Sequence, residues 1–243
     1  MYKPYKKYSY PKESLQGFSL LELSVVLAIG AVIISSGLTL AVTSLESDRR
    51  LETQNKMEFL ADTIRRFVAK FGYIPCPADA SLRFSSATFG VGEGTGDSGG
   101  NPCNSVNATS GATVTGMVPV TTLGLEPNMA LDGWNNRITY VIAEDLVRVG
   151  NPGNGWTGGD GNITISNEGG TAYTTTGVIA LISHGENGYG AWQGSGGTQV
   201  GATSGDAFED ENADLDAALI QTIPHSTDYD DYVIYRNKWQ LEP

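Results

Sequence analysis

The segment Gly17-Phe18-Ser19-Leu20-Leu21-Glu22-Leu23 opens a stretch that continues without proline to Phe71 and decides the fold. From Phe18 to Val42 its residues are apolar or small, and Glu22 is the single ionisable side chain. As a helix, residues 18–42 would measure about 37 Å, enough to cross a hydrocarbon core ~30 Å thick. A carboxylate in lipid costs ~2.5 kcal/mol or more. The sequence therefore predicts a membrane helix in which Glu22 has a specific role.

A short basic segment precedes this helix. Residues 1–17 contain four lysines and one glutamate, and a basic flank of this kind is retained in the cytoplasm. The chain beyond about Val42 is then expected to be translocated. An ordinary signal peptide, cleaved near residues 35–37 or 41–44, is the alternative that these residues leave open.

The helix is expected to continue beyond its apolar run. Residues 45–71 contain neither Gly nor Pro, and four apolar side chains recur at helical spacing on one face: Leu60, Ile64, Phe67 and Phe71. Gly72 and Pro75 are expected to end the helix. The pattern predicts an amphipathic half, residues 43–72, that packs against a globular head.

The head, residues 73–243, is expected to be rich in β structure. Apolar, β-branched or alternating runs predict four strands, at residues 137–142, 162–166, 177–183 and 231–236. A polar insertion, residues 185–227, separates the last two and includes an acidic run in which residues 214–220 are expected to form a short helix. Adjacent strands joined by turns predict an antiparallel sheet laid on the helix, an α+β fold.

Charge and cysteine content restrict the classes of function. The chain of 243 residues has a formal charge of −12, and the few basic residues after Gly72 form no patch that would follow a phosphate backbone, which excludes nucleic-acid binding. Cys76 and Cys103 both follow the apolar run, and in an exported domain they are expected to form a disulfide. Two free thiols in a cytosolic protein are the alternative.

The opening of the stretch also carries a family resemblance. Gly17-Phe18-Ser19-Leu20-Leu21-Glu22, between a lysine-bearing leader and an apolar run, resembles a type IV prepilin cleavage and methylation site. Residues 132–140, 183–188 and 230–234 are similar to segments of type II secretion pseudopilins, whereas the insertion has no counterpart. The resemblance implies a pilin-like fold: a leader (1–17), a helix with a transmembrane half (18–42) and an amphipathic half (43–72), and a small antiparallel sheet in a periplasmic head (73–243).

The same resemblance implies how the chain is processed and assembled. A prepilin peptidase would cleave between Gly17 and Phe18 and methylate the new amino group of Phe18. Glu22 would then pair with the α-ammonium of a neighbouring subunit in a helical filament. The implied partners are the peptidase, other pilin or pseudopilin subunits, an inner-membrane assembly platform and the membrane. The implied location is the bacterial inner membrane, as a single-pass prepilin with a periplasmic head, and later a type IV pilus or type II secretion pseudopilus.

A calcium site follows from the resemblance as well. The resembled pseudopilins bind calcium in the loop between their last two strands, and Ca²⁺ requires six to eight oxygen ligands. The candidate ligands here are Ser183, Asn187, Asp228, Asp230 and Asp231. No other cofactor is expected.

The sequence contains no convincing catalytic motif. A Ser–His–Asp set such as Ser183, His225 and Asp231 can be written down, but no Gly-x-Ser-x-Gly lies between a strand and a helix. The expected protein is a non-enzymatic filament subunit, a minor pilin or a pseudopilin. The alternative is a membrane-anchored periplasmic enzyme or binding protein with an uncleaved signal-anchor.

Overall fold

A computed structural model describes residues 17, 19–92, 103, 113–143, 161–201, 204–214, 216–222 and 229–242. The chain divides into two compact units, residues 1–47 and 48–243. Helix α1 (Leu20–Phe71) begins in the first unit and ends in the second. The leader residues 1–16 and Phe18 lie outside the description, whereas Gly17 lies in an exposed non-helical position.

The helix begins and ends where local chemistry predicts. At its start, the backbone N–H of Glu22 donates to Ser19 Oγ (3.1 Å), and the backbone N–H of Ser19 donates to Glu22 Oε2 (3.4 Å). This reciprocal arrangement is a capping box, which satisfies N–H groups that the first turn leaves without helical partners. At its end, Gly72 adopts φ +75°, and its N–H donates to Val68 O (2.8 Å), as expected of a C′ glycine.

The prediction that residues 18–42 form a membrane-spanning half of this helix is wrong. Among the helical residues that the structure describes, no stretch is both long and apolar enough to cross a membrane. The apolar residues whose side chains are described, 20–32, would extend about 20 Å, and charged residues recur along the helix from Glu46 onward. The pilin-like fold class and the single-pass inner-membrane location, which both depended on this half, are corrected accordingly.

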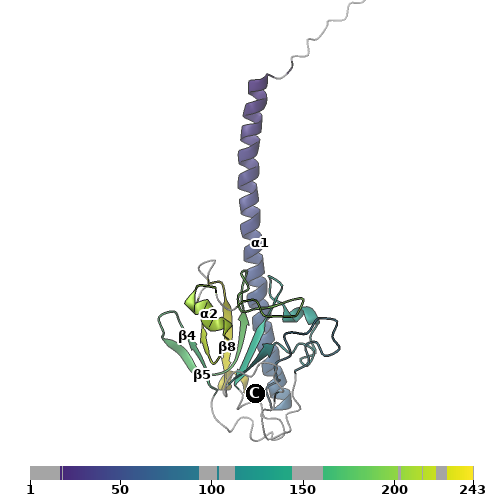
Figure 1. Cartoon of the computed structure of the whole chain (residues 1–243), viewed down its shortest axis with the longest axis vertical. Helices are drawn as coiled ribbons and strands as arrows, with labels where there is room; N and C mark the ends of the chain where they lie inside the picture. Colours follow the sequence, from purple (N-terminus) through teal and green to yellow (C-terminus); the bar gives the residue numbers. More distant parts are fainter. Residues whose placement is uncertain are drawn as a thin grey trace, which may run out of the picture. The chain divides into compact units, whose positions relative to one another are not determined.

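The second unit contains a six-stranded sheet (Figure 1). Its strands pair in the order β1-β3-β5-β4-β7, and β8 also pairs with β5. Strand β4 pairs parallel with β7, and the other pairs are antiparallel. The sheet is therefore mixed, and the prediction of a purely antiparallel sheet is wrong. These strands are β1 (Thr113–Met117), β3 (Thr139–Ala143), β4 (Ile163–Ser166), β5 (Ala172–Ser183), β7 (Ala218–Ile220) and β8 (Tyr232–Asn237).

Shorter elements complete the second unit. Strands β2 and β6 form a separate antiparallel pair. The bounds of the shorter elements are η1 (Pro127–Ala130), β2 (Asn136–Arg137), β6 (Trp192–Gln193), α2 (Ala207–Ala213) and α3 (Lys238–Leu241). Helix α2 and strand β7 both lie in the predicted insertion, where a helix was expected at residues 214–220. That prediction is wrong because residues 218–220 extend the sheet beside β4.

Alternate residues of the central strands face two hydrophobic clusters. One cluster joins the amphipathic face of α1 to the sheet and includes Leu60, Ile64, Tyr140, Ile142 and Leu181. The other lies on the opposite face and consists of Val141, Ile163, Ile165, Ala180, Ile182, Leu219 and Val233. Burial on both faces explains why the continuous apolar run at 177–183 forms a central strand. Figure 1 shows the end of α1 crossing behind this sheet.

The disulfide prediction is confirmed. Cys76 and Cys103 are joined, with their Cα atoms 5.5 Å apart. The bond closes a separation of 27 residues in a segment rich in Gly and Ser. Both cysteines belong to the cluster beneath α1, so the bond anchors this connection to the core.

Candidate metal centre

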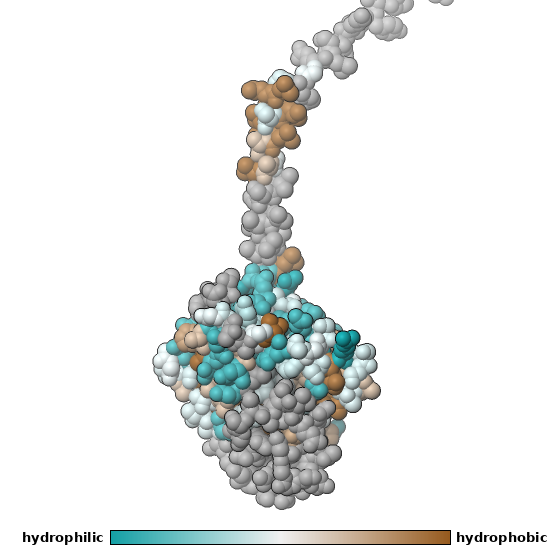
Figure 2. Space-filling model, in the orientation of Figure 1, coloured by the Kyte–Doolittle hydropathy of each residue, from teal (hydrophilic) through white to brown (hydrophobic). Residues whose placement is uncertain are grey.

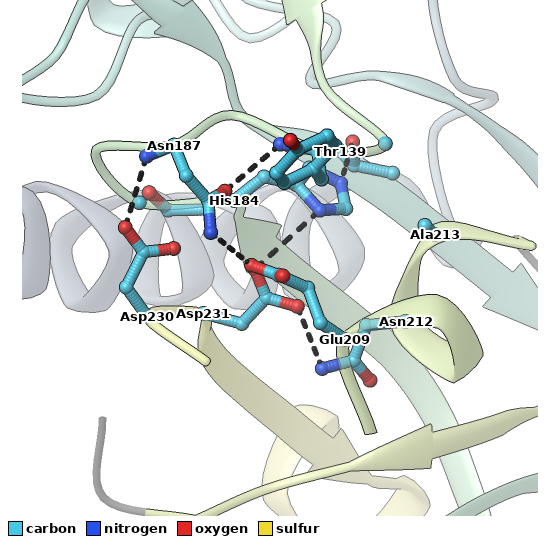
Figure 3. A network of polar contacts seen from close by, with 12 residues as sticks. Thr139, His184, Asn187, Glu209, Asn212, Ala213, Asp230 and Asp231 are labelled. Atoms are coloured by element: carbon cyan, nitrogen blue, oxygen red, sulfur yellow. Dashed lines mark hydrogen bonds and ion pairs between the residues drawn. The ribbon is translucent and has the colours of Figure 1, made fainter. Parts of the chain in front are cut away.

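Three segments far apart in the sequence meet at one end of the sheet (Figure 3). The loop that follows β5 contributes His184 and Asn187, helix α2 contributes Glu209 and Asn212, and Asp230 and Asp231 lie directly before β8. Glu209, Asp230 and Asp231 are all buried, and each contributes an oxygen to a group whose members lie within 4.8 Å of one another. We call these three residues the carboxylate trio.

The loop after β5 wraps closely around Asp230. The backbone N–H groups of Glu186 and Asn187 donate to Asp230 Oδ2 at 2.6 and 3.0 Å. Gly185 has φ +56°, and a Cβ at this position would lie 2.3 Å from the carboxyl carbon of Asp230. Only glycine therefore permits this approach, which fixes one oxygen of Asp230 and leaves the other directed elsewhere.

Helix α2 is oriented by its own cap and by its contact with β7. Asp206 Oδ1 accepts from the N–H groups of Phe208 and Glu209, a typical N-cap. Asn212 Oδ1 accepts from the N–H of Ile220 at 2.8 Å, and Asn212 Nδ2 donates to Asp231 Oδ2 at 2.9 Å. The helix therefore presents Asn212 and, one turn earlier, Glu209 to the end of β8.

Glu209 reaches the loop after β5. Its Oε1 accepts a hydrogen bond from Asn187 Nδ2 at 2.6 Å. On the other side of the trio, His184 is fully buried, with Nε2 3.2 Å from Thr139 Oγ1 and Nδ1 3.7 Å from Asp231 Oδ1. The last distance is too long for a hydrogen bond.

Each member of the trio keeps one buried oxygen without a hydrogen-bond partner. These atoms are Glu209 Oε2, Asp230 Oδ1 and Asp231 Oδ1, and His184 Nδ1 beside them also lacks one. Two unit charges at such separations repel by about 3–4 kcal/mol at an effective dielectric constant of ~20. A buried polar atom left unsatisfied calls for an explanation, and an ion is one of the standard explanations.

The pKa values of two members reflect this crowding. Burial, followed by the charges of Asp231 and Asp230, raises the pKa of Glu209 to about 7. Burial, with a smaller contribution from the charge of Asp231, raises the pKa of Asp230 to about 6. Hydrogen bonds from Asn187 to both residues act in the opposite direction without cancelling these effects.

No strongly basic side chain among the described residues neutralises the trio. Arg137 donates to the carbonyl oxygens of Ala80, Leu82, Gln193 and Gly194, and Arg236 pairs with Glu58. In the part of the chain that the structure describes, His184 is the only basic side chain within 4 Å of a trio oxygen, and its ring is charged only if protonated. The negative charge is therefore available to a cation.

The donor set fits a hard divalent cation. Ca²⁺ accepts carboxylate, amide and carbonyl oxygens in a flexible geometry, and three carboxylates supply a large part of the six to eight that it needs. The three buried oxygens without partners are the atoms that would face such an ion. The residues present therefore fit the calcium ion that the resemblance implies.

The structure brings together some of the ligands that the sequence predicts. Asp230, Asp231 and Asn187 are brought together, whereas Asp228 lies outside the described residues. Ser183 is not brought to the trio, since its Oγ donates to Asp132 Oδ2 at 2.7 Å. Glu209 was missed, although Asp206 three residues before it matches the Asp-x-x-Glu pattern that opens a helix.

Comparison with family models, with curated proteins and with solved structures found no match for this chain.

Proposed function

We propose that the chain is a non-enzymatic subunit of a pilus-like filament, either a minor pilin or a type II secretion pseudopilin, which assembles through the first turns of α1. The observation that supports this proposal is the exposure of apolar side chains there (Figure 2). Eight of them are between 50% and 88% exposed: Leu20, Leu21, Leu23, Val25, Val26, Leu27, Ile29 and Val32.

These side chains point to all sides of the helix. Leu20 and Leu21 are adjacent, as are Val25, Val26 and Leu27, so no single face of the helix is polar. Burying one such side chain gains about 1.5–3 kcal/mol. A helix that is apolar all round requires apolar neighbours on every side, and the same segments of other copies supply them in a filament.

Glu22 has two competing roles in this proposal. After cleavage between Gly17 and Phe18 by a prepilin peptidase, its carboxylate would pair with the α-ammonium of a neighbouring subunit and set the axial register. The capping box with Ser19 is a purely local role for the same carboxylate. Glutamine also serves in a capping box, so Glu22→Gln removes the charge and retains the cap.

The test uses the full-length chain in cells that assemble the filament. Glu22→Gln is expected to abolish incorporation into sheared filaments, whereas Ser19→Ala, which removes the cap and keeps the carboxylate, is expected to preserve it. Mass spectrometry of the mature protein should find N-methylated phenylalanine at Phe18. Normal incorporation of the Glu22→Gln protein, or a mature protein that retains residues 1–17, would refute the proposal and favour an enzyme or a binding protein.

The head of this subunit is further proposed to hold one calcium ion between Asp230 and Asp231. The candidate ligand Asn187 is left out, because its Oδ1 accepts from the N–H of Tyr189 and its Nδ2 donates to Glu209. The supporting observation is the pair of buried oxygens without hydrogen-bond partners, Asp230 Oδ1 and Asp231 Oδ1. Calcium titration of the chelated protein, followed by calorimetry, is expected to show one site per chain. Absence of binding would remove the calcium proposal and leave the filament proposal standing.

A further inference from the structure

We propose that Glu209, which lies in the insertion, is a ligand of the same cation, so that the ion clamps α2 and β7 onto the end of the sheet. The inference rests on the proposed calcium site and adds to it a residue to which the pseudopilin resemblance assigns no role. It also explains how the part of the insertion that forms α2 and β7 would be held on the sheet.

The first argument is geometric. Glu209 is fully buried, and it is the one member of the trio that comes from the insertion. Oxygens of all three carboxylates lie within 4.8 Å of one another, a separation that a single ion at ordinary Ca²⁺–oxygen distances of ~2.3–2.6 Å can bridge. Figure 3 shows Glu209 directed from α2 toward Asp231, with its other oxygen held by Asn187.

The second argument concerns atoms that the trio leaves unsatisfied. Glu209 Oε2 is buried and has no hydrogen-bond partner. Nδ1 of His184 is an independent sign, because this fully buried ring comes from a different strand end and directs an unpartnered nitrogen toward Asp231 Oδ1. Polar atoms from three segments therefore converge on one place, where the ionised carboxylates offer only acceptors and a proton on Glu209 is needed for it to donate to Asp230.

The third argument is that α2 needs an external restraint. The helix comprises 7 residues, and helices shorter than ~12–15 residues are marginal in isolation. Without a cation, Glu209 brings a third carboxyl group beside Asp230 and Asp231, and ionisation of all three opposes docking. With a divalent cation the same three groups attract one centre, so the ion converts a repulsive contact into a restraint.

The nature of the donors indicates the class of cation. The trio offers carboxylate oxygens, and no cysteine of the described residues is free. Hard cations such as Ca²⁺ prefer this set, whereas Zn²⁺ favours nitrogen and sulfur. Binding of Zn²⁺ in preference to Ca²⁺ would instead indicate a site built around His184.

The experiment combines calorimetry with hydrogen–deuterium exchange on the full chain, first chelated and then titrated with CaCl₂, MgCl₂ or ZnCl₂. Glu209→Gln is nearly isosteric and removes a buried charge, so it is expected to fold. Glu211→Gln is the matched control, since it makes the same change on the same helix at a residue outside the trio. Asp231→Asn tests the site itself.

In the wild-type chain, Ca²⁺ is expected to slow exchange at least about tenfold in peptides covering residues 206–222, with little change in β1. Glu209→Gln is expected to weaken Ca²⁺ binding at least about tenfold and to abolish this protection, whereas Glu211→Gln retains both. If the wild-type chain binds no Ca²⁺, both the calcium site and the role of Glu209 as its ligand are refuted. If it binds Ca²⁺, but Glu209→Gln binds equally well or exchange at 206–222 does not change, the clamp is refuted and the calcium site stands.

Discussion

Replacing Glu209 by glutamine is expected to stabilise the cation-free protein at alkaline pH and to destabilise it when calcium is present. The reason is that the buried carboxyl group has a raised pKa in the folded chain. Folding therefore favours its protonated form, and ionisation opposes folding. Glutamine keeps the shape and cannot ionise.

The magnitude follows from the pKa. In the folded chain the pKa of Glu209 is about 7, against an ordinary value of 4.5. One pKa unit corresponds to about 1.4 kcal/mol, so full ionisation costs about 3 kcal/mol of stability. Between these two pKa values the folded state binds more protons than the unfolded state. The contribution of Glu209 to stability is therefore fully present below pH 4.5 and is lost as the pH rises through 7. Glu209→Gln removes this loss.

The assay is urea unfolding at pH 5, 6, 7 and 8 in chelator, for the wild type, Glu209→Gln and Glu186→Gln. Glu186 lies on the neighbouring loop with an exposed side chain, and its replacement is expected to leave the pH profile close to that of the wild type. The difference in unfolding free energy between Glu209→Gln and the wild type should grow by about 2–3 kcal/mol from pH 5 to pH 8. The difference between the proteins is the quantity to compare, because the other titrating groups are common to both.

Saturating calcium should reverse the order of stability at pH 8, because the ionised carboxylate then becomes a ligand. A pH-independent difference between Glu209→Gln and the wild type in chelator would refute the electrostatic reasoning. An unchanged order of stability with and without calcium would refute the role of Glu209 as a ligand.

Two further outcomes are expected. Cys103→Ala should lower the free energy of unfolding by about 3–4 kcal/mol in urea titrations, and a reducing agent should have the same effect on the wild type and none on the variant, because the disulfide closes a separation of 27 residues. Gly185→Ala should lower stability by more than about 1 kcal/mol and weaken calcium binding, since its Cβ would meet Asp230, whereas Gly201→Ala, which meets no atom within 4 Å, should be nearly neutral in the same measurements.

Where side-chain periodicity is strong, the sequence predicts the fold well. The helical spacing of Leu60, Ile64 and Phe67 identified the face of α1 that is buried, whereas Phe71, predicted on the same face, is 47% exposed at the end of the helix. The apolar run at 177–183 identified the central strand, but the first half of β5, residues 172–176, was not predicted. Its Ala, Tyr and Thr side chains are largely exposed, so no apolar pattern marks it, and pairing with β4 determines its conformation.

The insertion was the hardest part to predict, because its elements depend on partners elsewhere in the chain. Residues 218–220 contain Ala and Leu, which favour helix, yet they form β7 through parallel pairing with β4. The helix lies earlier, behind the cap at Asp206. The trio could not be predicted in full for the same reason: Asp230 and Asp231 are neighbours in sequence, but Glu209 lies beside them because α2 packs against β7, for example through the hydrogen bond from the N–H of Ile220 to Asn212.

Glu22 and Glu209 both lie near the start of a helix, but the sequence and the structure rank them differently as candidate functional residues. Glu22 is the more conspicuous in the sequence, because it is the only charge in an apolar run, yet it is exposed and its carboxylate accepts a hydrogen bond from Ser19. Glu209 is inconspicuous within an acidic run, yet it is buried, and one of its oxygens has no hydrogen-bond partner. Local capping accounts for the position of Glu22 without any partner molecule, whereas Glu209 accepts a hydrogen bond from the neutral amide of Asn187 and has no ion pair with a described residue. The need for an external ligand is therefore stronger at Glu209 than at Glu22, and the isosteric change to glutamine tests both residues in the same way.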